Sequence, residues 1–432
     1  MTDINRRAFI RAAGGVAALG ATLGFPSLAL GSARRVVVVG GGVGGSTVAK
    51  YLRKLDPTLA VTLIETKPSY TTCFMSNEVL GGERTLESIT FGYDGLRRHG
   101  VDVVMDTAVG IDPVKKTVQT ASGKGFDYDA CVVSPGIDFK WGAIAGYNAE
   151  IAANSVPHAW NAGPQTLLLR RQIEAMPEGG RVIIVAPPDP FKCPPGPYER
   201  ASQIALYCKH HKPRAKIIIL DAKDAFSKQG LFIEGWTKLY GYGTDNSMIQ
   251  WVGGSGGGKV ESLDAAKLSI QAEIEEFKGD VVNIIPPQKA GAIAFAADLA
   301  EGDWCPVNKR TFESKRHKDI YVLGDASSAA KMPKSAYAAN SQAKVAAAAI
   351  VSRFHGLEPG DPTFVNTCYS VVGEDFGISV AAVYSHDAAT NSIEPIPNSG
   401  GISPAKASPE IRKREVSYAH SWFKNVINDM LE

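Results

Sequence analysis

The sequence predicts an α/β fold of two doubly wound domains followed by a smaller α+β segment, on three observations. The stretch 35–39, an arginine followed by four valines, has the pattern of a buried parallel strand and leads straight into a glycine-rich turn at 40–45. Two further apolar runs, 181–185 and 216–220, are spaced as in a second unit of the same kind. With 432 residues, 44% of them hydrophobic and 21% charged, the chain is globular and too long for one core.

Residues 1–31 have the features of an export signal and are set apart from the fold. Arg6 and Arg7 form a twin-arginine pair, and a weakly apolar, Ala/Gly-rich run follows at 12–30. A buried N-terminal helix is the alternative, which the glycines of the run disfavour. We expect cleavage near residues 29–31. We also expect a periplasmic location, since the twin-arginine route exports proteins that have already folded around a cofactor.

Charge and hydropathy argue against two classes of partner. The 46 basic and 44 acidic side chains almost balance, so the net charge implies no nucleic acid or other polyanion. Beyond the signal, no run reaches the roughly 18 apolar residues that a membrane span requires. The sequence therefore predicts a soluble protein without membrane insertion.

The glycine-rich turn matches the G-x-G-x-x-G pattern of dinucleotide binding in its required setting, between a strand and a helix. Gly40 permits the tight turn, Gly42 lets the backbone approach a pyrophosphate, and Gly45 lets the helix pack close to the strand. The next strand, 60–64, ends in Glu65, where a carboxylate would accept hydrogen bonds from ribose hydroxyls. Together these features predict a Rossmann-like dinucleotide site.

Two later segments favour FAD over NAD as that dinucleotide. The strand at 129–133 ends in a small-residue turn that contains Gly136, similar to the second FAD-contacting motif of flavoproteins with two dinucleotide domains. The strand at 319–323 ends in Gly324 and Asp325, similar to their third motif, whose aspartate holds the ribityl or phosphate end of FAD. An ordinary turn is the alternative for each, but the motifs follow one another in the order of that superfamily.

The second doubly wound unit lacks a glycine-rich loop. In NADH-dependent flavoproteins with two dinucleotide domains, glycines follow the first strand of this unit and bind the nicotinamide dinucleotide. Here the strand 181–185 runs into a proline-rich segment, 186–190 (APPDP), and then reaches Cys193. Proline has no N–H and a fixed φ, so this loop is poorly suited to binding a pyrophosphate through its backbone. NADH is therefore not the expected electron donor.

Four segments of the chain are long and rich in uncommon residues. They are Tyr70–Glu78 (YTTCFMSNE), Cys193–Arg200 (CPPGPYER), Pro333–Tyr337 (PKSAY) and Asn366–Ser370 (NTCYS). On these segments, nearly all of the chain from residue 33 onward resembles the flavoprotein subunit of flavocytochrome c sulfide dehydrogenase. It is similar, more distantly, to sulfide:quinone oxidoreductases and to glutathione-reductase-like flavoproteins.

The resemblance implies a glutathione-reductase-like flavoprotein fold, with two Rossmann-like domains and a C-terminal α+β interface domain. The expected boundaries are 1–31 for the signal, 32–146 and 287–356 for the FAD-binding domain, 147–286 for a second Rossmann-like domain without an NAD site, and 357–432 for the interface domain.

The resemblance also implies roles for three cysteines. Cys73 stands where the family attaches FAD covalently through a thioether to the flavin 8α carbon, whereas a small buried apolar residue is the alternative. Cys193 and Cys368 stand where the family has its redox-active disulfide, with a purely structural disulfide as the alternative. Spacing along the chain alone would not have paired these two cysteines.

The implied reaction is the oxidation of sulfide to zero-valent sulfur, released as polysulfide. HS⁻ attacks one sulfur of the Cys193–Cys368 disulfide, which leaves a persulfide on one cysteine and a thiolate on the other. The thiolate passes two electrons to the flavin, which returns them singly to a haem acceptor. We expect Cys368 to be the sulfur nearer the flavin.

Two charged residues complete the predicted site. Glu199, six residues after Cys193, is a candidate proton acceptor, although a surface ion pair with Arg200 or Lys209 is the commoner arrangement. Lys334 is a candidate cofactor-binding cation near the flavin pyrimidine edge, and a solvated loop lysine is its alternative.

The remaining cysteines indicate that any haem belongs to another chain. They lack the C-x-x-C spacing of a zinc site and the C-x-x-C-H of haem attachment, so no metal site is predicted. We expect packing roles for all three: Cys131, Cys208 and Cys305. The resemblance implies a cytochrome c subunit as partner in a heterodimer. The C-terminal stretch 415–432 mixes apolar and polar residues, which favours a soluble cytochrome over a membrane quinone as acceptor.

The leading hypothesis is therefore an enzyme, the FAD subunit of a periplasmic sulfide:cytochrome c oxidoreductase. Two alternatives stay open. One is a sulfide:quinone oxidoreductase, and the other is a catalytically silent flavoprotein partner of a sulfur-oxidising complex.

Overall fold

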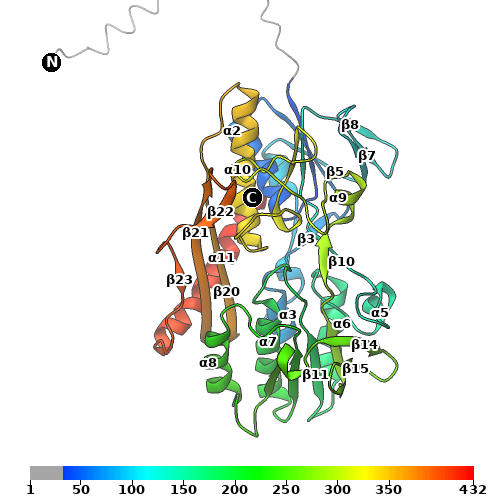
Figure 1. Ribbon diagram of the computed structural model, residues 1–432, viewed down its shortest axis with the longest axis vertical. Helices are drawn as coiled ribbons and strands as arrows, with labels where there is room; N and C mark the ends of the chain where they lie inside the picture. Colours follow the sequence, from blue (N-terminus) through cyan, green and yellow to red (C-terminus); the bar gives the residue numbers. More distant parts are fainter. Residues whose placement is uncertain (1–32) are drawn as a thin grey trace, which may run out of the picture. The chain divides into compact units, whose positions relative to one another are not determined.

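The computed structural model describes residues 33–432, and a five-stranded parallel sheet forms the first part of the fold (Figure 1). Its strands are β1 (Arg35–Val39), β2 (Ala60–Glu65), β5 (Val101–Met105), β9 (Ala130–Val133) and β19 (Ile320–Val322). They lie in the order β19-β9-β1-β2-β5, and every neighbouring pair is parallel. The central strands β1 and β9 are almost entirely buried, as expected for a parallel sheet covered on both faces.

Two long helices, α2 (Val43–Leu55) and α10 (Ala336–Phe354), pack side by side next to this sheet (Figure 1). The start of α10 is capped by Ser335, whose Oγ accepts a hydrogen bond of 3.0 Å from the Ala338 amide. The same hydroxyl donates to Oδ1 of Asn366 at 2.5 Å. Ser335 therefore links the start of α10 to the strand that carries Asn366.

A second parallel sheet consists of β11 (Arg181–Val185), β12 (Lys216–Leu220), β13 (Ile249–Val252) and β17 (Val281–Ile284), in the order β13-β12-β11-β17. Alternate side chains face opposite sides of it. Val182 and Ile184 pack with α6 (Pro164–Ala175), α7 (Gly196–His211) and α8 (Gln229–Tyr240). Ile183 and Val185 pack on the other side with α5 (Ala149–Asn154) and a small antiparallel sheet. Both faces are covered, which explains the continuous apolar runs in the sequence.

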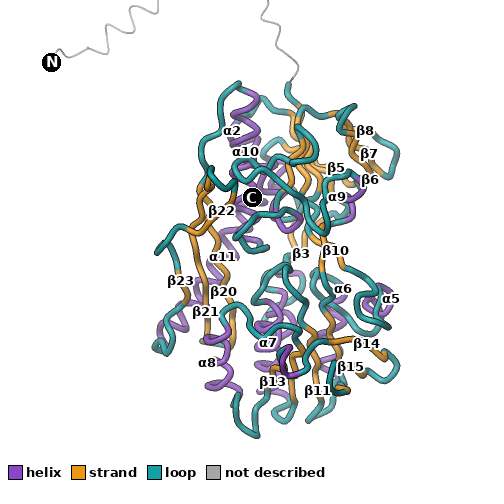
Figure 2. The backbone as a smooth tube through the Cα atoms, in the orientation of Figure 1, coloured by secondary structure: helices purple, strands orange, loops and turns teal. Residues whose placement is uncertain are grey.

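A long hairpin and a helix end the chain (Figure 2). The strands are β20 (Thr363–Gly373), β21 (Phe376–Asp387), β22 (Ser392–Pro395) and β23 (Gly401–Ile402), and the helix is α11 (Pro409–Leu431). The helix packs on β20, β21 and α2. Lys50 donates to the carbonyl of Asn428 at 2.8 Å, and Tyr51 donates to Asp429 at 2.7 Å. The C-terminal helix is thus fixed to the first domain.

Short elements connect these parts. They are β3 (Ser69–Thr71), α3 (Ser76–Gly81), β4 (Thr90–Gly92), α4 (Asp94–Arg98), β6 (Ala108–Asp112), β7 (Thr117–Thr120), β8 (Gly125–Asp127), β10 (Ile137–Phe139), β14 (Val260–Asp264), β15 (Ser269–Ala272), β16 (Glu276–Lys278), β18 (Gln288–Ala290) and α9 (Ala292–Ala296), with 3-10 turns at Glu87–Ile89, Gly254–Gly256 and Gly324–Ala326.

The two parallel sheets and the C-terminal hairpin with its helix confirm the predicted fold class. The predicted twin-arginine signal, 1–31, lies outside the described residues. Within residues 33–432, none of the helices combines the length and the apolar character that crossing a membrane would demand.

Gly45 provides a test of the close packing between α2 and the first glycine loop. A Cβ on Gly45 would lie 1.8 Å from the carbonyl oxygen of Gly40, so the backbone would have to move. We expect Gly45→Ala to lower the free energy of unfolding by about 2 kcal/mol or more, as overpacking typically does, measured by urea denaturation. Gly110→Ala in β6 is the control, because a Cβ there meets nothing within 4 Å. An unchanged urea midpoint for Gly45→Ala would contradict this account.

Candidate active site

A large cleft lies at the carboxyl ends of the strands of the first sheet, where ligands bind in open α/β folds. It contains about 1130 Å³ of empty space. Six of the residues predicted to bind the cofactor line it: Gly40, Gly42, Glu65, Cys73, Gly136 and Asp325. The structure therefore brings three motifs from distant parts of the sequence into one cleft.

The first glycine loop has the conformation that its predicted role requires. Gly40 has φ +97°, a left-handed value that glycine adopts readily, and its Cα faces the Ser134 carbonyl so closely that a Cβ would lie 2.5 Å away. Glu65 accepts a hydrogen bond of 2.6 Å from the Gly41 amide and one of 3.0 Å from the Lys67 amide. These bonds hold its carboxylate beside the loop, at the edge of the cleft.

Asp325 tests whether the cleft suits FAD. Its Oδ1 atom is buried and has no hydrogen-bond partner among the described residues. Burial raises the pKa of this carboxyl, although Lys192 and Lys334 act in the opposite direction. A buried acceptor without a donor is costly and calls for a ligand hydroxyl such as those of a ribityl chain. The residues of the cleft fit FAD.

Cys73 lies at the boundary between this cleft and a second cavity. It follows β3, and its carbonyl accepts hydrogen bonds from the amide (3.3 Å) and hydroxyl (2.6 Å) of Ser76 at the start of α3. Cys73, Lys192 and Ala336 line both cavities. Burial, together with the neighbouring Cys73 thiol, raises the pKa of Tyr70 well above its ordinary value. The Cys73 thiol thus adjoins the nucleotide cleft, as covalent attachment requires.

The second cavity brings the three singled-out cysteines together. It contains about 820 Å³ of empty space, and Cys73, Cys193 and Cys368 all line it, with several aromatic side chains: Phe74, Trp160, Tyr337, Tyr369 and Trp422. We call it the thiol cavity. Cys193 and Cys368 are free thiols in the structure, and the disulfide between them stays a prediction.

Cys193 is held in place by its backbone. It has φ +58°, its amide donates to the carbonyl of Lys334 at 2.8 Å, and its carbonyl accepts from the Gly196 amide at 2.8 Å. A Cβ on Gly196 would lie 3.1 Å from Cys193 Sγ and 2.5 Å from the Trp160 ring. The first residue of α7 therefore has to be very small. Burial raises the pKa of the Cys193 thiol, and Glu199 adds to this effect.

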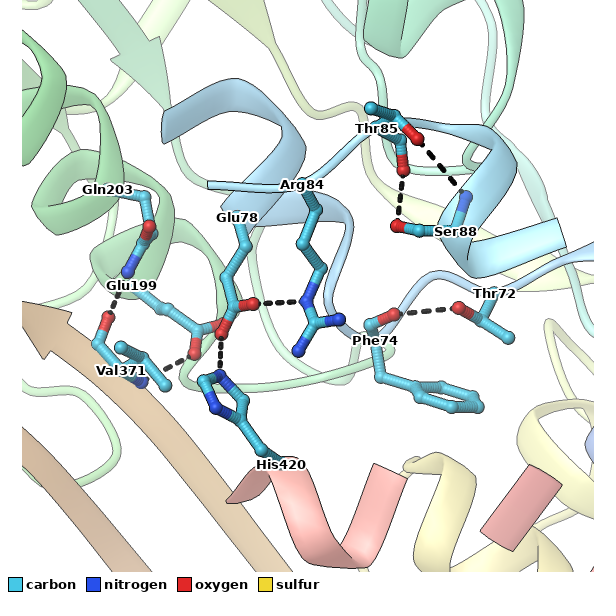
Figure 3. Close-up of polar contacts among 10 residues, drawn as sticks. All are labelled: Thr72, Phe74, Glu78, Arg84, Thr85, Ser88, Glu199, Gln203, Val371 and His420. Carbon is cyan, nitrogen blue, oxygen red and sulfur yellow. Dashed lines mark hydrogen bonds and ion pairs between the residues drawn. The ribbon is translucent and has the colours of Figure 1, made fainter. Parts of the chain in front are cut away.

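Glu199 lines the same cavity and is half-buried. The surface ion pair predicted as its alternative does not form, because its carboxylate is hydrogen-bonded to other groups (Figure 3). Its carboxylate accepts hydrogen bonds from the Val371 amide (2.8 Å) and from Asn77 Nδ2 (2.9 Å). Burial raises the pKa of Glu199, although both hydrogen bonds oppose the effect. The neighbouring Arg200 instead donates to groups away from Glu199, among them the carbonyls of His158 and Ala159.

A second carboxylate, that of the buried Glu78, lies near Glu199, and its pKa is shifted in the opposite direction (Figure 3). Burial alone would raise the pKa of Glu78, but His420, at 2.7 Å, and Arg84 lower it overall. Paired carboxyl groups whose surroundings separate their pKa values are typical of sites where one gains and loses protons. Glu199 is therefore the better candidate for proton transfer, and Glu78 is held as an ionised carboxylate.

Lys334 lies outside both cavities. Its ammonium donates to the carbonyls of Asp325 (2.8 Å) and Ser327 (2.9 Å) and lies 3.7 Å from the centroid of the Trp304 ring. Burial lowers the pKa of Lys334 to about 8. Its predicted place beside the flavin stays a prediction, and its carbonyl accepts the hydrogen bond from the Cys193 amide.

Lys192 lines both cavities, and the sequence did not predict it as a site residue. Its Nζ donates to the Trp160 carbonyl (3.1 Å) and to Asn161 Oδ1 (3.2 Å). The only signal in the sequence was its position next to Cys193. Trp160 was missed as well, since nothing in its local sequence marks it as a wall of the cavity.

At the edge of the second sheet where a Rossmann-like domain binds its dinucleotide, the acidic residue has other partners. Asp221 follows β12, where a Rossmann-like domain places the acid that binds a ribose. Its carboxylate is fully buried and accepts four hydrogen bonds, from Tyr198 Oη, Trp251 Nε1, and the amide and ammonium of Lys223. Lys223 also donates to the Pro187 carbonyl at 2.7 Å. No acceptor capacity is left for a dinucleotide ribose.

The other cysteines lie in packed surroundings. Burial raises the pKa of Cys208 and Cys305 to about 12 and that of Cys131 further, so all three are poor nucleophiles. In the part of the chain that the structure describes, no group of three or more His, Cys, Asp or Glu side chains is arranged to hold a metal ion.

Family models match three successive stretches of the chain. Residues 34–157 match pyridine nucleotide-disulphide oxidoreductases. Residues 166–286 match the central part of the sulfide dehydrogenase (flavocytochrome c) flavoprotein chain, and 360–431 match the flavin-binding part of flavocytochrome c sulphide dehydrogenase.

Similar proteins agree with these matches. The chain is 63% identical over 46 residues to the sulfide dehydrogenase (flavocytochrome c) flavoprotein chain of Chlorobaculum thiosulfatiphilum, which is 11% of this chain and 96% of that sequence. It is 31% identical over 186 residues to the sulfide-quinone reductase of Aquifex aeolicus, which is 43% of this chain and 42% of that one.

Among solved structures, the sulfide:quinone oxidoreductase of the hyperthermophilic bacterium Aquifex aeolicus has the same fold. The TM-score is 0.68 at 21% identity, with 92% of each chain covered. Together with the family models and the Chlorobaculum relative, the two-cavity architecture confirms the predicted kinship. The chain belongs to the family of flavocytochrome c sulfide dehydrogenase flavoprotein chains.

Proposed function

We propose that this chain is the FAD-binding subunit of a periplasmic sulfide:cytochrome c oxidoreductase, which oxidises sulfide to zero-valent sulfur or polysulfide. One observation carries the proposal. Cys193, Cys368 and Glu199 line a single cavity that meets the nucleotide cleft at Cys73. A nucleophilic substrate, a disulfide and a flavin can therefore react in sequence without large movements of the chain.

In this proposal the thiol cavity binds H₂S beside a disulfide between Cys193 and Cys368. The Glu199 carboxylate accepts one proton of H₂S, which its raised pKa favours, and HS⁻ is the nucleophile that results. HS⁻ attacks one sulfur, the S–S bond breaks, and a persulfide and a thiolate result. Bound FAD would supply a two-electron acceptor that passes electrons on one at a time.

We propose that electrons leave toward a partner chain that carries the haem, because the family name includes a cytochrome. Aromatic side chains extend from the thiol cavity to α11. Tyr337 and Trp422 stack at 5.8 Å with an interplanar angle of 8°, and Phe74 lies 5.2 Å from Trp422. We propose a heterodimer with a cytochrome c subunit, assembled in the periplasm after twin-arginine export.

A sulfide:quinone oxidoreductase is the second candidate, favoured by the similarity to the Aquifex aeolicus reductase. Both candidates share sulfide as the donor and differ in the acceptor. A catalytically silent flavoprotein partner of a sulfur-oxidising complex is the third, and it differs from both in its inertness toward sulfide.

Anaerobic titration with sulfide tests the proposed reaction. We expect one equivalent of sulfide to bleach the flavin absorbance of the wild-type holoenzyme. Cys193→Ser and Cys368→Ser should each slow this bleaching at least ~1000-fold, because either change removes the disulfide. Cys208→Ser is the matched control, since that thiol is buried outside the cavity and should leave the rate unchanged.

The outcomes separate the three candidates. A wild-type flavin that sulfide does not bleach would leave only the silent partner. If the reduced protein passes electrons to cytochrome c without detergent, the cytochrome assignment holds. Reoxidation only by a quinone would favour the second candidate.

Cys73 is predicted to carry the flavin through a thioether. Acid precipitation of the wild-type protein should leave yellow colour in the pellet, because acid breaks noncovalent binding but not a thioether. Cys73→Ala should release the flavin into the supernatant while the native protein still absorbs as a flavoprotein, since the rest of the cleft is unchanged. A colourless wild-type pellet would rule out covalent attachment.

Glu199 should govern the acid side of the pH profile. Its pKa is raised by burial, so the carboxylate forms only as pH rises through that raised value. The rate of flavin reduction by sulfide should therefore fall as pH drops through this range, beginning above the ordinary value for glutamate. Glu199→Gln should lower the rate about 100-fold and abolish this acid limb. A Glu199→Gln profile that keeps the wild-type limb would assign the titration to another group.

A further inference from the structure

Lys228 occupies a position that is unfavourable for a lysine in two respects. It precedes α8 with φ +61°, in the left-handed region that non-glycine residues seldom adopt. Its side chain is also buried, and residue 228 as a whole is only 8% exposed. Burying an ammonium group is costly unless an anion compensates it. An interaction of the Lys228 side chain is therefore expected to offset both costs.

The ammonium of Lys228 is directed at the strand that carries Cys368. Its Nζ donates to the Cys368 carbonyl at 2.8 Å and to Ser370 Oγ at 2.8 Å. Both acceptors are neutral, so they orient the ammonium without cancelling its charge. The Phe232 ring, 5.8 Å away, contributes a weak attraction at most.

The strongest sources of negative charge for this ammonium line the thiol cavity. The groups that favour its charged form are, in decreasing order, Cys368, Glu199, Cys193 and Glu415. Burial lowers the pKa of Lys228 against all of them. A thiolate on Cys368 would supply the missing compensation.

We propose that Lys228 is a positioning residue that stabilises the Cys368 thiolate and so makes Cys368 the sulfur that leaves when the disulfide opens. This inference rests on the proposed function. HS⁻ bonds to Cys193 Sγ, the bond between the two cysteines breaks, and its electron pair goes to Cys368 Sγ. Cys193 then carries the S–SH group and Cys368 the negative charge, so atoms and charge balance.

The surroundings of Cys193 support this direction of attack. Among charged groups, the strongest influence on Cys193 is Glu199, which disfavours a thiolate there. The nearest lysine in sequence, Lys192, opposes that effect, but its ammonium is engaged with Trp160 and Asn161. The two sulfurs of the disulfide therefore differ as leaving groups, and the better one lies beside Lys228.

Alkylation of the reduced holoenzyme tests the proposal without sulfide. The rates of iodoacetamide modification of Cys368 and Cys193 are followed across pH by mass spectrometry. In Lys228→Met, the Cys368 rate near neutral pH should fall about tenfold, while the Cys193 rate changes less than about twofold. Lys228→Arg keeps the charge and should retain most of the wild-type profile. Other titratable groups that interact with Lys228 or Cys368 are unchanged in these variants: Glu199, Glu415 and Tyr384.

Lys50→Met is the matched control. Lys50 is also a buried lysine, and its ammonium donates to a backbone carbonyl at 2.8 Å. It is part of α2, however, and the carbonyl belongs to α11. Its loss should leave both cysteines at wild-type rates. The proposal is wrong if Lys228→Met leaves the Cys368 profile unchanged, if both cysteines shift equally, or if Lys50→Met has the same effect.

The sulfide reaction then provides a separate readout. In Lys228→Met, flavin bleaching by sulfide should slow by about the same factor as alkylation of Cys368. A wild-type flavin that does not bleach contradicts the proposed function, whereas the alkylation result for Lys228 stands independently of it.

Discussion

The hydrogen bond from the Cys193 amide to the Lys334 carbonyl is the contact on which the site depends. Cys193 follows the first strand of the second sheet, whereas Lys334 precedes the helix that packs with α2 beside the first sheet. A second bond close by, from the Lys192 amide to Gln288 Oε1 at 2.8 Å, reinforces the junction. Two sheets that share no strand are thereby joined at the wall between the cleft and the thiol cavity. The position of Cys193 relative to the nucleotide cleft is set at this wall.

Charge burial is the second constraint, and the protein meets it in different ways at neighbouring positions. Glu78 contacts Arg84 and His420, which lower its pKa, whereas Glu199 is held by an amide and an asparagine and keeps a raised pKa. Arg200 is surrounded by neutral acceptors, and burial lowers its pKa to about 9. The charged groups nearest the thiols are thus the ones left least compensated. Such groups respond most strongly when a negative charge appears on sulfur.

The sequence predicted those parts of the site that depend on local backbone geometry. The pattern around Gly40 is a strand, then a turn that needs glycine at positive φ, then a helix, all within about eleven residues. Gly40 can be recognised from that pattern alone. Asp325 was recognisable for the same reason, because it ends a strand. The pairing of Cys193 with Cys368 came only from family resemblance, since 175 residues separate them. The direction of side chains was the feature of the site that the sequence predicted least well, as Lys192 and Lys334 show. Both flank the site in sequence, but tertiary packing decides which ammonium enters it.

The four hydrogen bonds on Asp221 have a consequence for protein engineering. The carboxylate acts as an internal crosslink among Tyr198, Trp251 and Lys223, inside the core of its domain. A single substitution that freed Asp221 would leave a buried carboxylate without its donors and open a void, so it would be destabilising. A nicotinamide dinucleotide site could therefore not be built at this edge of the sheet one residue at a time. The three donors would have to be replaced together with Asp221.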